Sequence, residues 1–100
     1  MTETIKATDL PTLIGSELAP SDWLEITQER VNQFADATND FQFIHVDPDK
    51  AAKTPFGGPI AHGFLSLSLL SYLNAQTAVI PENLVMGINY GSDKVRYLQP

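Results

Sequence analysis

Asp40 and His45 are the two residues whose types and spacing best suit proton-transfer chemistry. They lie five positions apart in a short segment flanked by aromatic residues. A carboxylate and an imidazole on one loop can hold the same water molecule, and in apolar surroundings each stabilises a different protonation state of the other. The alternative is a solvated carboxylate beside a histidine that is hydrogen-bonded for structural reasons. The spacing by itself favours this alternative.

Gly63 is the second candidate, because it opens a long apolar segment after the sequence FGGPIAH. In the first turn of a helix the backbone N–H groups are unpaired and the helix dipole is positive, which suits an oxyanion. Glycine also allows a substrate carbonyl to approach closely. The alternative is a glycine needed for tight packing. His62 has no cysteine or acidic residue nearby in sequence to complete a metal site, so the sequence predicts no metal and a structural histidine at a helix start.

Three helices are predicted around these residues. Thr27 is a good N-cap, and an apolar face of the following residues recurs at helical spacing up to about residue 37. Residues 38–46 break this period and are expected to be a loop. Asp47 and Pro48 then restart a short helix to about residue 53. Residues 60–76, after Pro59, are apolar on nearly every side, which predicts a buried helix.

Strands are expected on both sides of these helices. Residues 23–26 resemble a short strand, and residues 84–90 and 94–98 predict one or two more. A short helix is expected near residues 7–14. These strands are too few to cover so apolar a helix, which calls for a larger curved sheet.

Composition excludes several classes of protein. The 100 residues form a single expected domain, with a net charge of −6 that argues against nucleic acid and anionic membranes as partners. The chain has no cysteine, which excludes disulfides and thiolate chemistry. The N-terminus lacks the apolar region of a signal peptide, so a cytoplasmic location is expected.

Taken together, the two segments resemble a known signature. An Asp-x4-His pair, a helix starting at Asp47-Pro48, and the FGGPIAHG sequence of residues 56–63 are similar to the hydratase motif of MaoC-like and NodN-like proteins. The resemblance covers nearly the whole chain and implies an α+β hot-dog fold, in which a long central helix is wrapped by a curved antiparallel sheet. Members of the family continue with further strands, so residues 1–100 would be either the N-terminal two-thirds of the domain or an unusually short member of the family.

The resemblance also implies a function. The family member would be an (R)-specific enoyl-CoA hydratase, in which Asp40 and His45 hold a water over C3 of a trans-2-enoyl thioester and the Gly63 N–H faces its carbonyl. The expected partners are an acyl-CoA or acyl carrier protein substrate and a second copy of the chain, with no cofactor beyond coenzyme A itself. Residues bordering the substrate would be Phe41, Phe56, Ser66 and Asn89, although for the two phenylalanines a place in the core is favoured.

Two departures and two alternatives accompany this interpretation. Asn39 stands where hydratases usually carry glycine, and Gln42-Phe43 replaces a common Asn-Pro. Asparagine tolerates left-handed backbone better than most residues, and NodN-like members share the second change. The alternatives are a non-catalytic subunit that binds acyl thioesters and, less favoured, a hot-dog thioesterase. The intact pair of Asp40 and His45 favours catalysis, since a pure binder does not need it.

Overall fold

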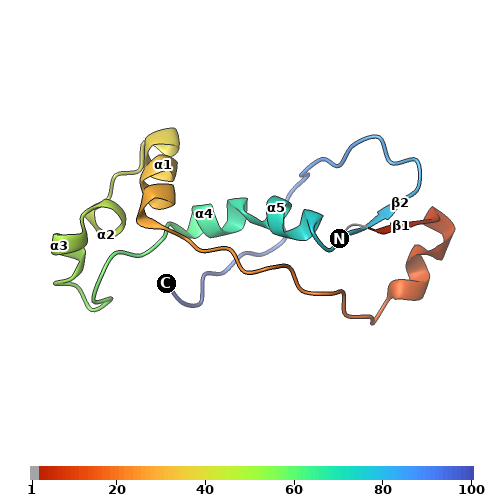
Figure 1. Ribbon diagram of the computed structural model, residues 1–100, viewed down its shortest axis with the longest axis horizontal. Helices are drawn as coiled ribbons and strands as arrows, with labels where there is room; N and C mark the ends of the chain where they lie inside the picture. The colour runs from red at the N-terminus through yellow and green to blue at the C-terminus, as the bar shows by residue number, and fades with distance from the viewer. Residues whose placement is uncertain (1–2) are drawn as a thin grey trace. The chain divides into compact units, whose positions relative to one another are not determined.

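The structure, a computed structural model, describes residues 3–100, which fall into two compact units. The first unit contains the chain up to Trp23 together with Leu70–Val95. The second contains Leu24–Leu69 and Arg96–Pro100. Figure 1 labels the helices and strands of both. Asp40, His45 and Gly63 all belong to the second unit.

The first unit is built on two short strands. β1 (Glu3–Ile5) and β2 (Val79–Pro81) pair in parallel, with Thr4 opposite Ile80. The 3-10 helix η1 (Ala7–Leu13) follows β1, close to the predicted residues 7–14, and α5 (Leu70–Ala75) precedes β2. The backbone N–H of Asp22 donates to the Gln76 side chain at 3.0 Å, which ties the end of the N-terminal segment to the residues after α5.

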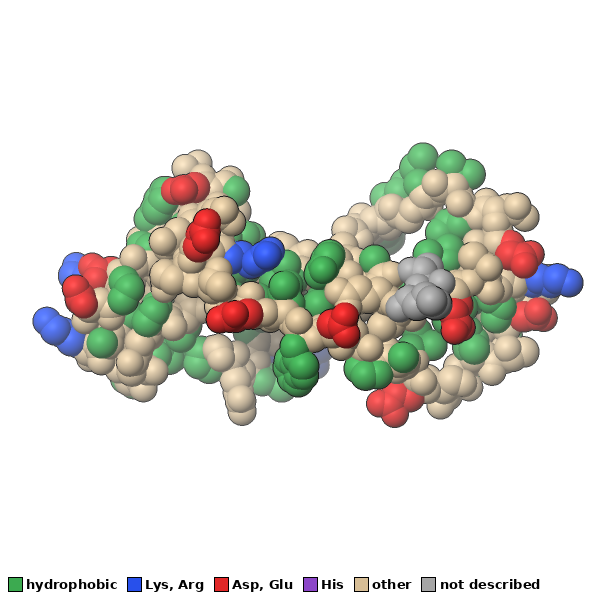
Figure 2. Space-filling view, viewed as in Figure 1, with side chains coloured by type: hydrophobic (Ala, Val, Ile, Leu, Met, Phe, Trp, Pro, Cys, Tyr) green, Lys and Arg blue, Asp and Glu red, His purple; other side chains and the backbone are tan. Residues whose placement is uncertain are grey.

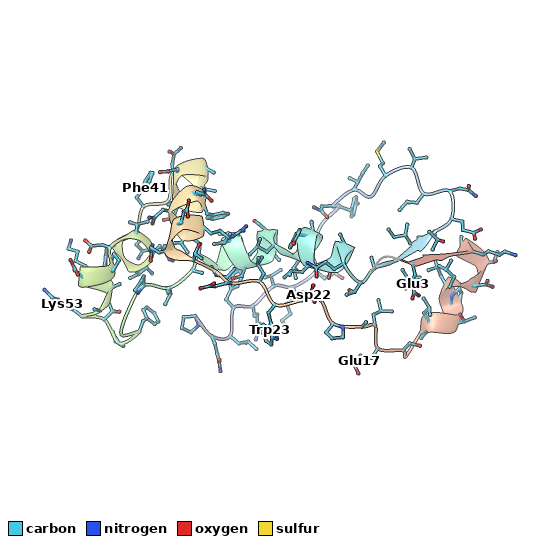
Figure 3. The ribbon with its side chains drawn as sticks, in the orientation of Figure 1. Glu3, Glu17, Asp22, Trp23, Phe41 and Lys53 are labelled. Carbon is cyan, nitrogen blue, oxygen red and sulfur yellow. The ribbon has the colours of Figure 1, made fainter. Side chains whose placement is uncertain are left out.

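The predicted strands are wrong for this chain. Residues 23–26, 84–90 and 94–98 are irregular, and the only sheet among residues 3–100 is the parallel pair rather than a curved antiparallel one. A strand forms only when a partner satisfies its N–H and C=O groups, and an alternating sequence does not supply that partner. Trp23 shows the result, because its side chain is fully exposed and projects away from the ribbon (Figure 3).

The predicted N-terminal helix of the second unit is confirmed as α1 (Gln28–Thr38). The Thr27 side chain accepts a hydrogen bond from the Arg30 N–H at 3.1 Å, as expected for an N-cap. Val31 and Ala35 are buried, so the predicted apolar face is the one that packs. The helix ends at Asn39, whose φ of 59° is left-handed.

Two single-turn helices follow α1. α2 (Phe43–Val46) falls within residues 38–46, which were predicted to be a loop, so that prediction is wrong for these four residues. One turn has no periodicity by which a sequence could reveal it. α3 (Pro48–Ala51) confirms the predicted restart, and the Asp47 carboxylate accepts from the Lys50 N–H at 3.1 Å, although the helix ends two residues earlier than expected.

The long helix predicted for residues 60–76 is two helices, α4 (Gly63–Ser68) and α5, with a break at Leu69. It begins three residues late, because Ile60 donates its N–H to the Ile44 carbonyl at 2.9 Å instead of entering a helix. Just before the break, the Ser68 hydroxyl donates to the Phe64 carbonyl at 2.7 Å. This i−4 interaction competes with the helix's own hydrogen bonding and often bends helices.

The segment 60–76 is also less buried than predicted. Leu65 of α4 is buried, but Phe64 is 68% exposed and Tyr72 of α5 is 57% exposed. The prediction of a buried helix failed because the strands that would wrap it are not formed. Apolar side chains are correspondingly visible at the surface in Figure 2. Within residues 3–100, the structure contains no helix with the length and apolar character needed to cross a membrane.

Candidate active site

Asp40 is positioned by the end of α1. The left-handed Asn39 turns the chain out of the helix, a conformation that asparagine adopts more readily than most residues. The Asp40 side chain then accepts a hydrogen bond from the Gln42 N–H at 3.3 Å, which leads into α2. Its carboxylate remains about half exposed, at 49%. Asp40 is therefore held by its own loop while its oxygens stay open to a water molecule.

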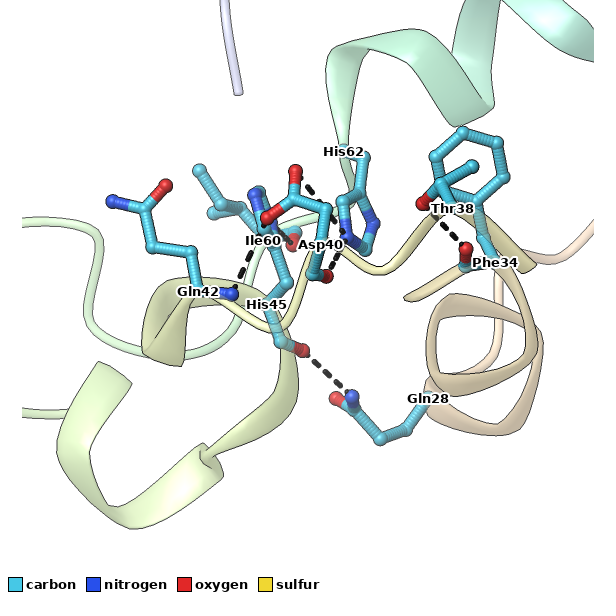
Figure 4. A network of polar contacts seen from close by, with 8 residues as sticks. All are labelled: Gln28, Phe34, Thr38, Asp40, Gln42, His45, Ile60 and His62. Carbon is cyan, nitrogen blue, oxygen red and sulfur yellow. Dashed lines mark hydrogen bonds and ion pairs between the residues drawn. The ribbon is translucent and has the colours of Figure 1, made fainter. Parts of the chain in front are cut away.

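His45 lies on α2 and is buried at 7% exposure. Its Nδ1 is 2.7 Å from the Ile60 carbonyl oxygen (Figure 4). A carbonyl oxygen can only accept, so Nδ1 carries a proton, and in the neutral ring Nε2 then has the lone pair. Gln28 of α1 donates to the His45 carbonyl at 2.7 Å and holds the backbone from the other side. The imidazole is thus fixed in the tautomer that can act as a base through Nε2.

His62 completes the cluster. It is 2% exposed and immediately precedes α4. Its Nε2 is 3.0 Å from the Asp40 carbonyl oxygen, and its ring stacks on His45 with centroids 3.9 Å apart and planes 23° apart. The ring of Phe34 packs on it at 4.9 Å. The sequence correctly placed this histidine at a helix start but missed its contact with both Asp40 and His45.

The three side chains offer one nitrogen or carboxylate oxygen each within 4.8 Å of one another. This spacing suits proton transfer through a shared water, since no direct bond joins the Asp40 carboxylate to either ring; its approach to His62 Nε2 is 4.0 Å. The same three residues are also close enough together to hold a metal ion. Because His45 Nδ1 and His62 Nε2 are committed to backbone carbonyls, a metal would have to use the other nitrogen of each ring. The absence of a metal stays a prediction.

Gly63 is the first residue of α4, as predicted. A Cβ built on it would lie 3.0 Å from the ring of Tyr97, so the glycine allows a close approach of that ring. Tyr97 also packs edge-on against Phe64 with centroids 6.3 Å apart. This contact supports the packing interpretation of Gly63. Its role toward an oxyanion stays a prediction.

The four predicted substrate-binding residues are all exposed. Phe41 is 55% and Phe56 is 49% exposed, so neither occupies the core that was the favoured alternative for them. Ser66 lies on α4 with its side chain in solvent. Asn89 belongs to the first unit, in the irregular segment after β2. Figure 3 labels Phe41 beside the end of α1. That these four residues bind substrate stays a prediction.

A family model for the MaoC like domain matches residues 9–100, and the chain belongs to this family. Nearly the whole sequence is matched, including Asp40, His45 and His62. This agrees with the resemblance of the Asp-x4-His and FGGPIAHG segments. The hot-dog fold is the fold that membership in this family implies.

Individual relatives agree with this assignment. The chain is 53% identical over 97 residues to Nodulation protein N of Rhizobium meliloti, covering 96% of the chain and 60% of that protein. It is 51% identical over 92 residues to 3-hydroxyacyl-thioester dehydratase Z of Mycobacterium tuberculosis, covering 92% of the chain and 60% of that protein. A shorter match, 45% over 47 residues, joins it to 3-hydroxybutyryl-CoA dehydratase of Methylorubrum extorquens, covering 47% of the chain and 30% of that protein. The chain spans about three-fifths of the length of the first two relatives.

Proposed function

We propose that the protein is a hydro-lyase that adds water to a trans-2-enoyl thioester, giving an (R)-3-hydroxyacyl thioester, and catalyses the reverse dehydration. The observation that carries this proposal is that the Asp40 carboxylate and the His45 imidazole have polar atoms within 4.8 Å of each other, while the Nδ1–H of His45 is held by the Ile60 carbonyl. Two relatives have names that describe dehydratases of 3-hydroxyacyl thioesters or 3-hydroxybutyryl-CoA, which supports the same chemistry.

The arrangement suggests a role for each group. A water held between the Asp40 carboxylate and His45 Nε2 loses a proton to Nε2 as its oxygen bonds to C3. The π electrons of the enoyl group move toward the thioester oxygen, and the resulting enolate charge meets the unpaired N–H of Gly63 at the start of α4. The proton taken up by His45 is then passed, through the Asp40 carboxylate, to C2; this collapses the enolate, returns both groups to their starting states and leaves the substrate with one added water. The (R) configuration and the Gly63 contact are carried over from the family resemblance.

The proposal also concerns the group that carries the acyl chain and the oligomeric state of the protein. Coenzyme A and acyl carrier protein present the same thioester, so both forms of the substrate should be assayed. A homodimer is expected from the family, and the cytoplasmic location stays a prediction from the sequence. The protein's own residues suffice for the chemistry proposed, which needs no additional cofactor.

The test is a direct assay with crotonyl-CoA. Loss of the enoyl thioester absorbance is followed with the full chain, Asp40→Asn and His45→Gln, and chiral chromatography of the product reads its configuration. Each substitution should lower the rate by roughly 10²–10⁴-fold, the usual contribution of a general acid or base. The matched control is Asp36→Asn, which removes an exposed carboxylate from α1 and should leave the rate unchanged.

Other outcomes would identify the alternatives. Full activity in both Asp40→Asn and His45→Gln would refute the assignment of the site. Release of free coenzyme A without hydration would instead indicate a thioesterase. Saturable binding of crotonyl-CoA without turnover by either reaction would indicate the non-catalytic subunit. Formation of the (S) product would leave the reaction type but reject the stereochemistry.

A further inference from the structure

His62 is a buried polar residue that the proposed reaction does not use directly. It is 2% exposed, and its backbone carbonyl accepts from Leu65 and Ser66 at 3.0 and 3.3 Å, which anchors the residue to the start of α4. A buried imidazole usually has its nitrogens hydrogen-bonded. Among residues 3–100, however, no partner is found for His62 Nδ1. The placement of this ring therefore depends on its remaining contacts.

Those contacts lead to both members of the proposed catalytic pair. His62 Nε2 donates to the Asp40 carbonyl at 3.0 Å, because a carbonyl oxygen can only accept. This bond spans 22 positions of the chain and attaches the Asp40 backbone to the start of α4. The same ring covers one face of the His45 imidazole at 3.9 Å. One side chain thus limits the movement of the carboxylate-bearing residue and of the imidazole (Figure 4).

His62 is withdrawn from solvent, and we expect it to make no direct contact with substrate. Its donor Nε2 is committed to a backbone oxygen, and its other nitrogen is buried. Without the Nε2 bond, Asp40 would keep only the 3.3 Å bond from Gln42 within its own loop. The left-handed Asn39 and the Gln42 bond restrain Asp40 only through its own loop, whereas the His62 bond attaches it to a distant part of the chain.

We infer that His62 is a positioning residue, which sets the Asp40 backbone through Nε2–H and the plane of the His45 ring by stacking. The inference rests on the proposed hydratase function and deepens it. Displacement of a catalytic group by about 1 Å can reduce a rate by roughly 10²-fold. Loss of His62 should therefore lower kcat selectively, with little change in KM, because the substrate does not touch it.

The test compares three variants in the crotonyl-CoA assay. His62→Ala removes the donor and the ring, and we expect kcat to fall by about 10–100-fold with KM within about threefold. His62→Gln keeps an N–H donor near the position of Nε2 and should recover part of this loss. Leu65→Ala is the control, because it removes a buried side chain from the same helix and should lower stability while leaving kcat of the folded protein within about twofold.

Non-additivity separates positioning from general damage. In an Asp40→Asn background, His62→Ala should cost no more than about threefold further, since residues that act as a unit are not additive. Circular dichroism and urea unfolding give the folded fraction of each variant. A kcat for folded His62→Ala within about threefold of the unsubstituted chain would overturn the inference. A full additional loss in the Asp40→Asn background would overturn it as well.

A second readout does not depend on activity. Long-range ¹H–¹⁵N NMR of the histidine rings should show the proton on Nδ1 of His45 and on Nε2 of His62. His62→Gln should shift the His45 ring resonances, because the stacked ring at 3.9 Å is gone. If the unsubstituted chain did not hydrate crotonyl-CoA, the proposed function would fail. The NMR measurement would still show whether His62 positions the His45 ring. Unchanged His45 resonances in His62→Gln would reject the positioning role.

Discussion

Gly63 shows how one position can serve packing and chemistry at once. Its missing side chain admits the Tyr97 ring, which would lie 3.0 Å from a Cβ. In a helix, alanine is otherwise favoured over glycine by roughly 0.8–1.0 kcal/mol. Whether Gly63→Ala raises or lowers stability therefore depends on Tyr97. Removing the Tyr97 ring separates this packing role from the predicted catalytic role of the Gly63 N–H.

We expect Gly63→Ala to destabilise the chain by about 1–3 kcal/mol, the usual cost of overpacking, measured by urea unfolding. In a Tyr97→Ala background the same substitution should become neutral or stabilising, because the obstructing ring is absent. If hydratase activity stays low in the double variant while stability recovers, the glycine serves the substrate as well. Equal destabilisation in both backgrounds would show that Tyr97 is not the neighbour that matters.

Asn39 accounts for one departure from the family pattern. Hydratases usually carry glycine there, and the φ of 59° shows why either residue is suitable. A residue with a Cβ and no polar compensation loses roughly 1–2 kcal/mol in this region. Asn39→Gly should therefore leave the urea midpoint nearly unchanged, whereas Asn39→Ala should lower stability by about 1 kcal/mol. Equal stability of the two variants would mean that residue 39 is not left-handed in solution.

Local capping interactions define the helices of the second unit. Thr27 caps α1 and Asp47 caps α3, each with a hydrogen bond to the backbone three residues later. These interactions involve neighbours in the chain, so the sequence predicted them well. The sequence did not predict α2, because a single turn has no periodicity. It also did not predict the break at Leu69, because the Ser68 hydroxyl bond beside it is one of several that a helical serine can form.

Thr27→Ala tests the cap of α1. Loss of an N-cap costs about 1 kcal/mol, and we expect the free energy of unfolding to fall by that amount. The matched control is Gln33→Ala on the exposed face of the same helix, which should change stability by no more than about 0.5 kcal/mol. A loss as large in Gln33→Ala would mean that helix propensity, and not the cap, determines the result.

Across the whole molecule, the predicted sheet is the main disagreement. No backbone N–H from Val85 onward is hydrogen-bonded to another residue of the described range 3–100, and Val85, Ile88 and Leu98 are more than three-quarters exposed. The alternating sequence pattern predicted strands here, and that prediction is wrong because no partner strand pairs with these residues. Exposed apolar runs of this kind often mark a surface that is covered in an assembly.

Hydrogen exchange measures this difference. Because residues 85–98 are irregular, their amides should exchange at rates within about tenfold of those of an unfolded chain. The amides in the interior of α1 should be protected much more strongly. The comparison is made within one sample, so that conditions are shared. Protection of residues 85–98 equal to that of α1 would contradict the irregular backbone and indicate that the segment pairs as a strand in solution.

The sequence by itself determined the identities of Asp40 and His45, the helix starts at Thr27 and Asp47, and the family motif, because each depends on residue type or on neighbours within a few positions. Only the tertiary structure decided the tautomer of His45, which the Ile60 carbonyl imposes from 15 positions away, and the contact of His62 with Asp40 across 22 positions. The same reason explains the strands. Pairing over long separations depends on which segments meet in space, and residue type does not specify that meeting.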